Sequence, residues 1–165
     1  MKKVAIVMGS DSDLPVVKKA GDVLKEFGVP VEWHVLSAHR SPVQVAEFAR
    51  SAADNGFGVV IAAAGMAAHL AGAIAGNTIL HVIAIPVKAK ALEGIDALLS
   101  SVMMPPGVPV ATVGIDGAAN AAYLAVQILA VSDSELSQKL VAFKKAQNEK
   151  NLEADKKIAQ LAEQN

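Results

Sequence analysis

The chain has 165 residues, a length that is typical of one domain, and 53% of them are hydrophobic. Its 15 Lys and Arg residues nearly balance its 16 Asp and Glu residues, so the net charge of −1 gives no support to a nucleic-acid partner or a polybasic membrane contact. The absence of cysteine excludes a disulfide scaffold, a thiolate metal site and a cysteine nucleophile, and it permits the cytoplasmic location that we expect.

The apolar content raises the question of a membrane segment. The longest apolar run, residues 57–68, has 12 residues, whereas a membrane-spanning helix needs roughly 20. Lys2 and Lys3 lead directly into a short apolar run, so we expect no signal peptide. We therefore expect a soluble protein with an unusually apolar interior, and this excess in a small domain favours burial of some apolar surface between subunits.

Short apolar runs alternate with helical patterns along the chain. The pattern predicts strands at residues 4–8, 31–36, 59–63, 81–87 and 109–113, helices at residues 13–27, 42–55, 67–76 and 118–130, and a less regular stretch at residues 88–108. Because parallel strands need crossover connections, this alternation predicts an α/β fold of three layers, with helices on both faces of a doubly wound, flavodoxin-like parallel sheet of about five strands. Ligands of such sheets bind beyond the C-terminal strand ends, so function is expected in the loops after Met8, Leu36, Ala63 and Val87.

The C-terminal segment differs in composition. Residues 133–165 contain six acidic and six basic residues, and Ser132 with Glu135 has the pattern of a capping box that opens a long helix. We divide the chain here into residues 1–131, the flavodoxin-like domain, and residues 132–165, a helical arm of the same domain. The polar middle of the arm is typical of a solvated helix laced with charges. The alternative is an arm that reaches across a neighbouring subunit.

Polar residues follow the first predicted strand directly, in the segment Gly9-Ser10-Asp11-Ser12-Asp13. Free N–H groups at a helix start, short hydroxyl side chains and a glycine suit an anionic oxygen ligand. The segment matches neither the dinucleotide fingerprint nor the Walker loop. The alternative interpretation is that Ser and Asp are the usual N-caps, although three polar residues beyond the single one that a cap needs favour a ligand.

The second predicted strand is followed by Ser37-Ala38-His39-Arg40-Ser41-Pro42. Arginine can clamp a phosphate through its planar fork, and histidine can move a proton near neutral pH. The alternative is that Ser41 caps the helix that starts at Pro42, while His39 and Arg40 are merely exposed. That alternative explains Ser41 well and His39 poorly.

After the third predicted strand, the segment from Gly65 to Gly72 has one strongly polar side chain, His69. Its small residues let the backbone line a pocket, but a lone histidine among apolar residues is more often a hydrogen-bonded core residue. His34 and His81 fall within predicted strands and are interpreted as structural or surface residues. The four histidines lack the spacing of metal ligands, so we expect no metal site.

These segments together resemble one enzyme family, the class I form of N5-carboxyaminoimidazole ribonucleotide mutase. The resemblance extends from about Val4 to Leu129. It is carried, in family order, by Met8-Gly9-Ser10-Asp11-Ser12-Asp13, Ser37-Ala38-His39-Arg40-Ser41-Pro42, Ala67-Ala68-His69-Leu70 and Met104-Pro105-Pro106-Gly107-Val108-Pro109-Val110-Ala111-Thr112. Each motif alone is weak, but four in order at the predicted sheet edge are specific.

The resemblance implies a reaction of purine biosynthesis that needs no cofactor. The carboxylate of N5-carboxyaminoimidazole ribonucleotide moves from the exocyclic amine to ring carbon C4, and 4-carboxy-5-aminoimidazole ribonucleotide forms. The CO₂ is released and recaptured in a closed pocket. The resemblance also implies homo-octamers with sites between subunits, and functional coupling to the ATP-dependent carboxylating enzyme of the pathway.

The resemblance also carries over individual residues. His39 is implied as the catalytic, proton-transferring residue, and Arg40 as the partner of the substrate phosphate. The implied substrate-binding residues are Ser10, Asp13, Ser37, Arg40, Ala67 and His69. The chain departs from the usual family pattern in the carboxylate pocket and the lid, where Met66, Ala71 and Met103 replace Gly, Pro and Gln.

Two alternatives remain at this point. The class II carboxylase adds free CO₂ to aminoimidazole ribonucleotide, and it typically has Lys where this chain has Arg40 and Arg-Ser-Asn where it has Met66-Ala67-Ala68. These differences favour the mutase. The second alternative, from another class, is a non-catalytic flavodoxin-like module that binds phosphate or a nucleotide and gives His39 no role.

Overall fold

The computed structural model describes residues 1–162 and contains one five-stranded sheet in which neighbouring strands are parallel. The strand order is β2-β1-β3-β4-β5, the flavodoxin-like order. The strands are β1 (Lys3–Met8), β2 (Val31–Val35), β3 (Phe57–Gly65), β4 (His81–Val87) and β5 (Ala111–Thr112). The predicted fold class is confirmed.

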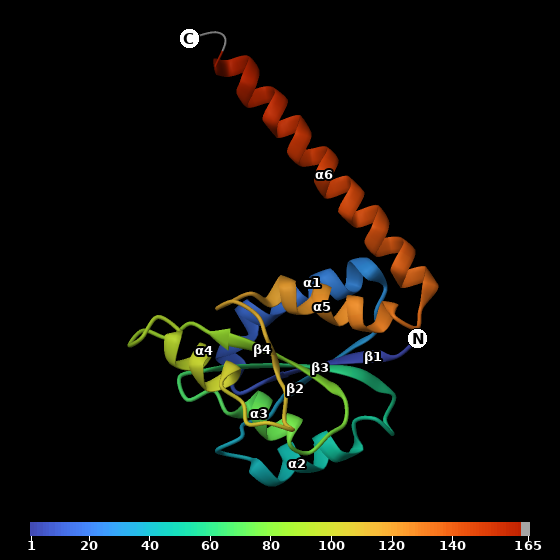
Figure 1. Ribbon diagram of the computed structural model, residues 1–165. Helices are drawn as coiled ribbons and strands as arrows, with labels where there is room; N and C mark the ends of the chain where they lie inside the picture. The colour runs from blue at the N-terminus through green and yellow to red at the C-terminus, as the bar shows by residue number, and fades with distance from the viewer. Residues whose placement is uncertain (163–165) are drawn as a thin grey trace.

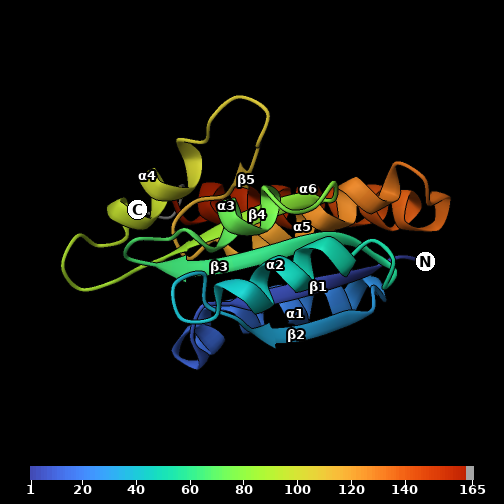
Figure 2. The same cartoon turned by 90° about the horizontal axis from the view of Figure 1, so that it is seen from below.

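Helices cover both faces of the sheet (Figures 1 and 2). The helices α1 (Leu14–Phe27) and α5 (Ala118–Ala130) pack side by side on one face, and α2 (Pro42–Ser51) and α3 (Leu70–Ala75) lie on the other. A short helix, α4 (Ile95–Val102), packs beside β4 and β5, and a single 3₁₀ turn, Asp11–Asp13, precedes α1.

The alternation of side chains along β1 explains why its sequence is continuously apolar. Val4, Ile6 and Met8 face the layer of α1 and α5, while Ala5 and Val7 face the layer of α2 and α3. All five side chains are buried, because a strand in the middle of a doubly wound sheet has no solvent-facing side. The same burial on both faces continues along β3.

Helix α1 ends where the sequence predicts. Gly28 has a φ of +74°, the left-handed conformation that glycine adopts readily, and its N–H donates to the carbonyl groups of Leu24 and Lys25. The chain then turns directly into β2. Trp33 on β2 lies over Gly21 of α1, where a Cβ atom would approach the indole ring to 2.4 Å. This lone tryptophan therefore packs the edge strand against a helix.

Helix α4 was not predicted, and the expectation of irregular structure at residues 88–108 was wrong for this part. Its buried face consists of Ala97 and Ser101, while Ile95, Leu99 and Val102 are exposed. Small or polar residues inside and large apolar residues outside reverse the usual pattern of a surface helix. The next strand is also shorter than expected, because β5 has only two residues.

The long helix α6 (Ser134–Ala162) is present, but the predicted capping box is wrong. Asp133, not Ser132, caps it, since the Asp133 carboxylate accepts from the N–H groups of Glu135 and Leu136, both at 3.1 Å. Residues 163–165 of the predicted arm lie outside the described residues. None of the described helices is long and apolar enough to cross a membrane.

Only the start of α6 packs on the domain. Leu136 is fully buried, and Phe143 contacts Phe27 edge to face and stacks on Tyr123 with ring centroids 4.7 Å apart. From residue 144 to residue 160 every side chain is exposed. The helix therefore projects away from the body along its second half (Figure 1).

Candidate active site

A cavity of about 540 Å³ lies at the C-terminal ends of β1, β2, β3 and β4. This is the edge at which doubly wound sheets bind ligands. All the residues that the sequence nominated line it, namely Ser10, Asp13, Ser37, His39, Arg40, Ala67 and His69. The four loops expected to carry function thus meet in one place, although the nominated residues span 60 positions of the chain.

The first loop is held by its own polar side chains. The Ser10 Oγ accepts from the Ser12 N–H at 3.3 Å, and the Asp13 carboxylate accepts from the Ser10 N–H at 3.2 Å. The two residues therefore form a reciprocal cap on the 3₁₀ turn, as the N-cap interpretation requires. They also line the cavity, so capping and ligand contact are compatible.

Asp13 has an altered acidity. Burial raises its pKa above the ordinary value of 3.8, since it penalises the charged carboxylate. The Ser10 N–H and the Arg40 guanidinium oppose this rise by stabilising the charge, whereas Asp11 adds to it. The net pKa direction is upward, so the fold makes this carboxylate easier to protonate.

The second loop is a tight turn with internal hydrogen bonds. The Ser37 N–H donates to the Ser41 Oγ at 2.9 Å, the Ser41 N–H donates to the Ser37 carbonyl at 2.9 Å, and the Arg40 N–H donates to the Ser37 Oγ at 3.2 Å. Ser41 lies at the N-cap position of α2, as the alternative interpretation expects, but its hydroxyl makes no cap bond to that helix. The two serines instead lock the turn that carries His39 and Arg40.

Arg40 bridges the first and second loops. Its Nη2 donates to the Gly9 carbonyl at 2.6 Å. Gly9 follows β1 directly, so the guanidinium lies over the start of the first loop, close enough to Asp13 to affect its pKa. A guanidinium has five N–H donors, and this bond leaves others free for an anion.

The histidines of the second and third loops are in direct contact. The His39 Nε2 lies 2.8 Å from the His69 Nδ1, and the ring planes are 76° apart. Both side chains are exposed to the cavity side of this single chain. The interpretation of His69 as a core residue is therefore wrong: it is hydrogen-bonded, but it faces the site.

The third loop has an unusual backbone. Met66 has a φ of +53°, the left-handed region that favours glycine, and its side chain is 66% exposed at the edge of the cavity. The resembling family commonly has Gly at this position, and the φ value gives the physical reason. The chain places a bulky residue where the backbone suits glycine.

Lys88 lines the cavity but was not nominated from the sequence. It follows β4 directly, its N–H donates to the Asp116 carboxylate at 2.9 Å, and its ammonium group forms an ion pair with Glu93. The hydrogen bond to Glu93 raises its pKa above the ordinary value of 10.5. The signal for it was present, since the loop after Val87 was expected to carry function and Lys88 is its first residue.

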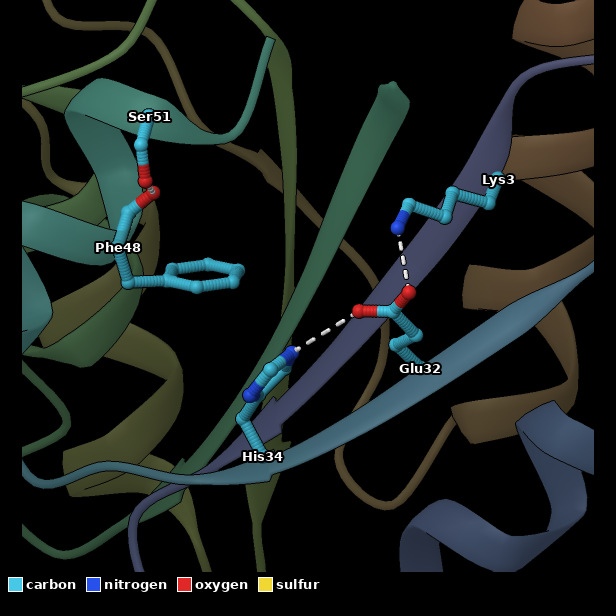
Figure 3. A network of polar contacts seen from close by, with 5 residues as sticks. All are labelled: Lys3, Glu32, His34, Phe48 and Ser51. Atoms are coloured by element: carbon cyan, nitrogen blue, oxygen red, sulfur yellow. Dashed lines mark hydrogen bonds and ion pairs between the residues drawn. The ribbon is translucent and has the colours of Figure 1, made fainter. Parts of the chain in front are cut away.

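His34 belongs to a separate cluster on β2. Its ring points toward Glu32, with the Nε2 3.9 Å from a carboxylate oxygen, and Lys3 contacts the same carboxylate from the other side (Figure 3). It packs against Phe48 with ring centroids 4.8 Å apart. His34 thus takes no part in the cavity. No group of three or more potential metal ligands occurs among the described residues.

Comparison with known proteins links this geometry to named relatives. An N5-carboxyaminoimidazole ribonucleotide mutase of Pyrococcus abyssi is 56% identical over 144 residues, which cover 87% of this chain and 83% of that protein. An enzyme of the same name from Thermotoga maritima is 47% identical over 161 residues, which cover 98% of this chain and 94% of that protein.

Solved structures and family models agree with these relatives. The crystal structure of Treponema denticola PurE matches with a TM-score of 0.86 and 30% identity over 93% of this chain and 96% of that one. The model of the family described as AIR carboxylase matches residues 3–150, which include every nominated residue of the cavity. The chain therefore belongs to the AIR carboxylase family.

Proposed function

We propose that this protein is an N5-carboxyaminoimidazole ribonucleotide mutase, which moves the substrate carboxylate from the exocyclic amine to ring carbon C4 in purine biosynthesis. The relatives of that name support this proposal. The observation that carries it is the meeting of His39, Arg40 and the first loop in one cavity. A phosphorylated substrate needs a cation such as Arg40, and a proton transfer near neutral pH needs a base such as His39.

The phosphate is assigned to the junction of the first and second loops. Arg40 supplies a permanent cation there, and its bond to Gly9 holds the guanidinium in place while other N–H donors stay free. Ser37 supports the phosphate side. Ser10 and Asp13 bind the ribose part, where a carboxylate accepts hydrogen bonds from hydroxyl groups.

The carboxylate is assigned to the third loop. Ala67 and His69 border it, and small side chains there leave room for CO₂ while they exclude water. His39 transfers the proton, since the ring carbon that gains the carboxylate must lose a proton and a base with a pKa near neutrality suits this step. The carboxylate thus moves from nitrogen to carbon within one pocket.

An isotope experiment separates the mutase from the carboxylase alternative. The purified protein is mixed with 4-carboxy-5-aminoimidazole ribonucleotide labelled in its carboxylate, without ATP, in the presence of unlabelled bicarbonate. We expect the label to stay with the nucleotide during interconversion. Rapid exchange with the bicarbonate pool would assign the protein as a carboxylase that uses free CO₂.

Two variants separate the enzyme from a binding module. His39→Asn should abolish most turnover and leave the substrate Kd nearly unchanged, whereas Arg40→Ala should weaken substrate binding by about tenfold to a hundredfold, the effect of removing a charged hydrogen bond. Circular dichroism checks that both variants fold. A wild-type protein that binds the nucleotide but does not turn it over would support the non-catalytic module instead.

We also propose that the protein works as a homo-oligomer, an octamer as the resemblance implies, in the cytoplasm and alongside an ATP-dependent carboxylating enzyme. Two surfaces support an oligomer. The outer face of α4 exposes Ile95 and Leu99, Met103 directly after this helix is also exposed, and every residue of α6 from 144 to 160 is exposed on this single chain. Most of the stability of helices in proteins comes from packing of one face, and this part of α6 buries no face on its own chain, so the arm of residues 132–165 is expected to lie on a neighbouring subunit.

A further inference from the structure

We propose that His69 is a positioning residue for His39: through the bond between its Nδ1 and the His39 Nε2, it fixes which nitrogen of His39 is free to exchange a proton with the substrate. This inference rests on the proposed function, in which His39 transfers the proton. It goes further because it gives the His69 side chain a role through His39, beside any contact of His69 with the substrate carboxylate.

Both histidines lie in loops whose backbones are held by hydrogen bonds. The His69 N–H donates to the Ala67 carbonyl at 3.0 Å, and its carbonyl accepts from the Ala73 N–H at 2.9 Å at the start of α3. His39 lies in the turn that Ser37 and Ser41 lock. The contact between the rings therefore joins two anchored loops, from the ends of β2 and β3.

The distance between the two nitrogens limits the tautomers that the pair can adopt. Two imidazole nitrogens 2.8 Å apart need one proton between them, because two lone pairs or two N–H groups facing each other repel. We assign this proton to the His39 Nε2. His39 then presents an unprotonated Nδ1, which is the atom that can take the proton from ring carbon C4 as this carbon gains the carboxylate and deliver it to the exocyclic nitrogen that has lost the carboxylate.

The charges around the pair come from three side chains. The other ionisable side chains that line the cavity, among the described residues, are Asp13, Arg40 and Lys88. Two of these are cations, and the carboxylate is the one that burial makes easier to protonate. When the His39 Nδ1 accepts a proton, its Nε2–H still donates to His69, so the charge gains an acceptor at once. A second proton on His69 would destroy that acceptor.

Matched replacements of His69 test the assignment. Asparagine places a polar atom at the same number of bonds from Cα as the His69 Nδ1, and glutamine places one at the position of Nε2. If His69 acts through His39, both variants lose turnover. The kcat of His69→Asn should nevertheless stay about tenfold higher than that of His69→Gln, at a similar KM, since the loss of an outer-shell partner typically lowers activity by about tenfold to a hundredfold. The low-pH limb of the kcat profile should move in His69→Gln and much less in His69→Asn.

A spectroscopic measurement makes the test independent of turnover. Nitrogen-15 NMR of labelled imidazoles should find one His39 tautomer, protonated at Nε2, in the wild type, and a mixture in His69→Gln. Equal kcat values for the two variants with a changed KM, or a single unchanged His39 tautomer in both, would overturn the proposal and leave His69 as a substrate contact.

The proposed function is tested separately in the same series. The wild type and His39→Asn are assayed first with the ribonucleotide. If the wild type shows no interconversion, the proposed function is wrong. The NMR measurement of the His39 tautomer still tests, in that case, whether the bond to His69 fixes the ring. If the wild type is active and the variants do not differ, the inference about His69 alone is wrong.

Discussion

Met66 holds its strained backbone at the edge of the cavity, with a φ of +53°. Met66→Gly should raise the free energy of unfolding by about 0.5–1 kcal/mol, since a left-handed conformation costs an L-residue more than the extra backbone entropy of glycine. Urea denaturation measures the change. Met66→Ala is the matched control, because it shortens the side chain and keeps the Cβ. An equal gain in Met66→Ala would attribute the effect to the exposed side chain instead.

Asp13 links stability to pH. Because its folded pKa is raised, the folded state binds a proton more readily than the unfolded state, so the stability that this group contributes is full below its ordinary pKa of 3.8 and is lost as pH rises through the folded pKa. Asp13→Asn, which stays neutral and still offers an oxygen to the Ser10 N–H, should be more stable than the wild type near neutral pH, with a higher KM.

The control for Asp13→Asn is the same comparison in acid. Well below the ordinary pKa of 3.8 the wild-type carboxyl is protonated in the folded and the unfolded state, and the stability difference should disappear. Urea midpoints of both proteins at the two pH values provide the measurement. A variant that is less stable than the wild type near neutral pH would show that the charge, and not its burial, dominates at this position.

Individual site residues were predictable where their chemistry stands out against their surroundings. His39 and Arg40 follow a predicted strand, and this position places them at the edge of the sheet where ligands bind. Lys88 was missed because a single lysine after a strand resembles any solvated charge. The contact between His39 and His69 joins residues 30 positions apart. No spacing rule reaches across the crossover through α2 and β3, so this pairing required the structure.

At the scale of elements, the start of α6 gives a direct test of its cap. Asp133→Ala should lower the free energy of unfolding by about 1 kcal/mol, because two N–H groups of the first helical turn lose their acceptor. Ser132→Ala serves as the control and should change it by less than about 0.5 kcal/mol. Urea denaturation of both variants makes the comparison. A larger loss from Ser132→Ala would restore the capping box that the sequence predicts.

The strands and the major helices were predictable because the residues that they bury are apolar and follow the period of a strand or a helix. Strands such as β1 have no exposed face, and α1 has an apolar stripe that Gly28 ends. Helix α4 lacks that contrast, since it buries Ala97 and Ser101 and exposes Ile95 and Leu99. The large apolar residues of α4 recur on its exposed face, so the helical period in its sequence marks the face that is opposite to the buried one. Patterns of burial within one chain cannot predict such a helix.

For the whole molecule, the exposed face of α4 and the projecting part of α6 connect stability to association. If these surfaces pack on other subunits, the folded state is favoured by mass action, and the midpoint of thermal unfolding should rise with protein concentration by about 2–4 °C for each tenfold increase. Calorimetry over a hundredfold range of concentration, with light scattering for the mass, provides the check. A constant midpoint and the mass of one chain would contradict the oligomer.

The sheet order has a consequence for how the chain reaches its fold. Strand β1 is made first and ends up between β2 and β3, where Val4 pairs with Val31 on one side and with Val59 on the other. At a synthesis rate of about 5–20 residues per second, the second edge of β1 waits for about 3–10 s before β3 exists. During that time a strand that is apolar from Val4 to Met8 offers unpaired N–H and C=O groups. Nascent chains of this protein should therefore depend on chaperones most strongly before residue 65 has emerged, and refolding should be slow because the central pairing is non-local.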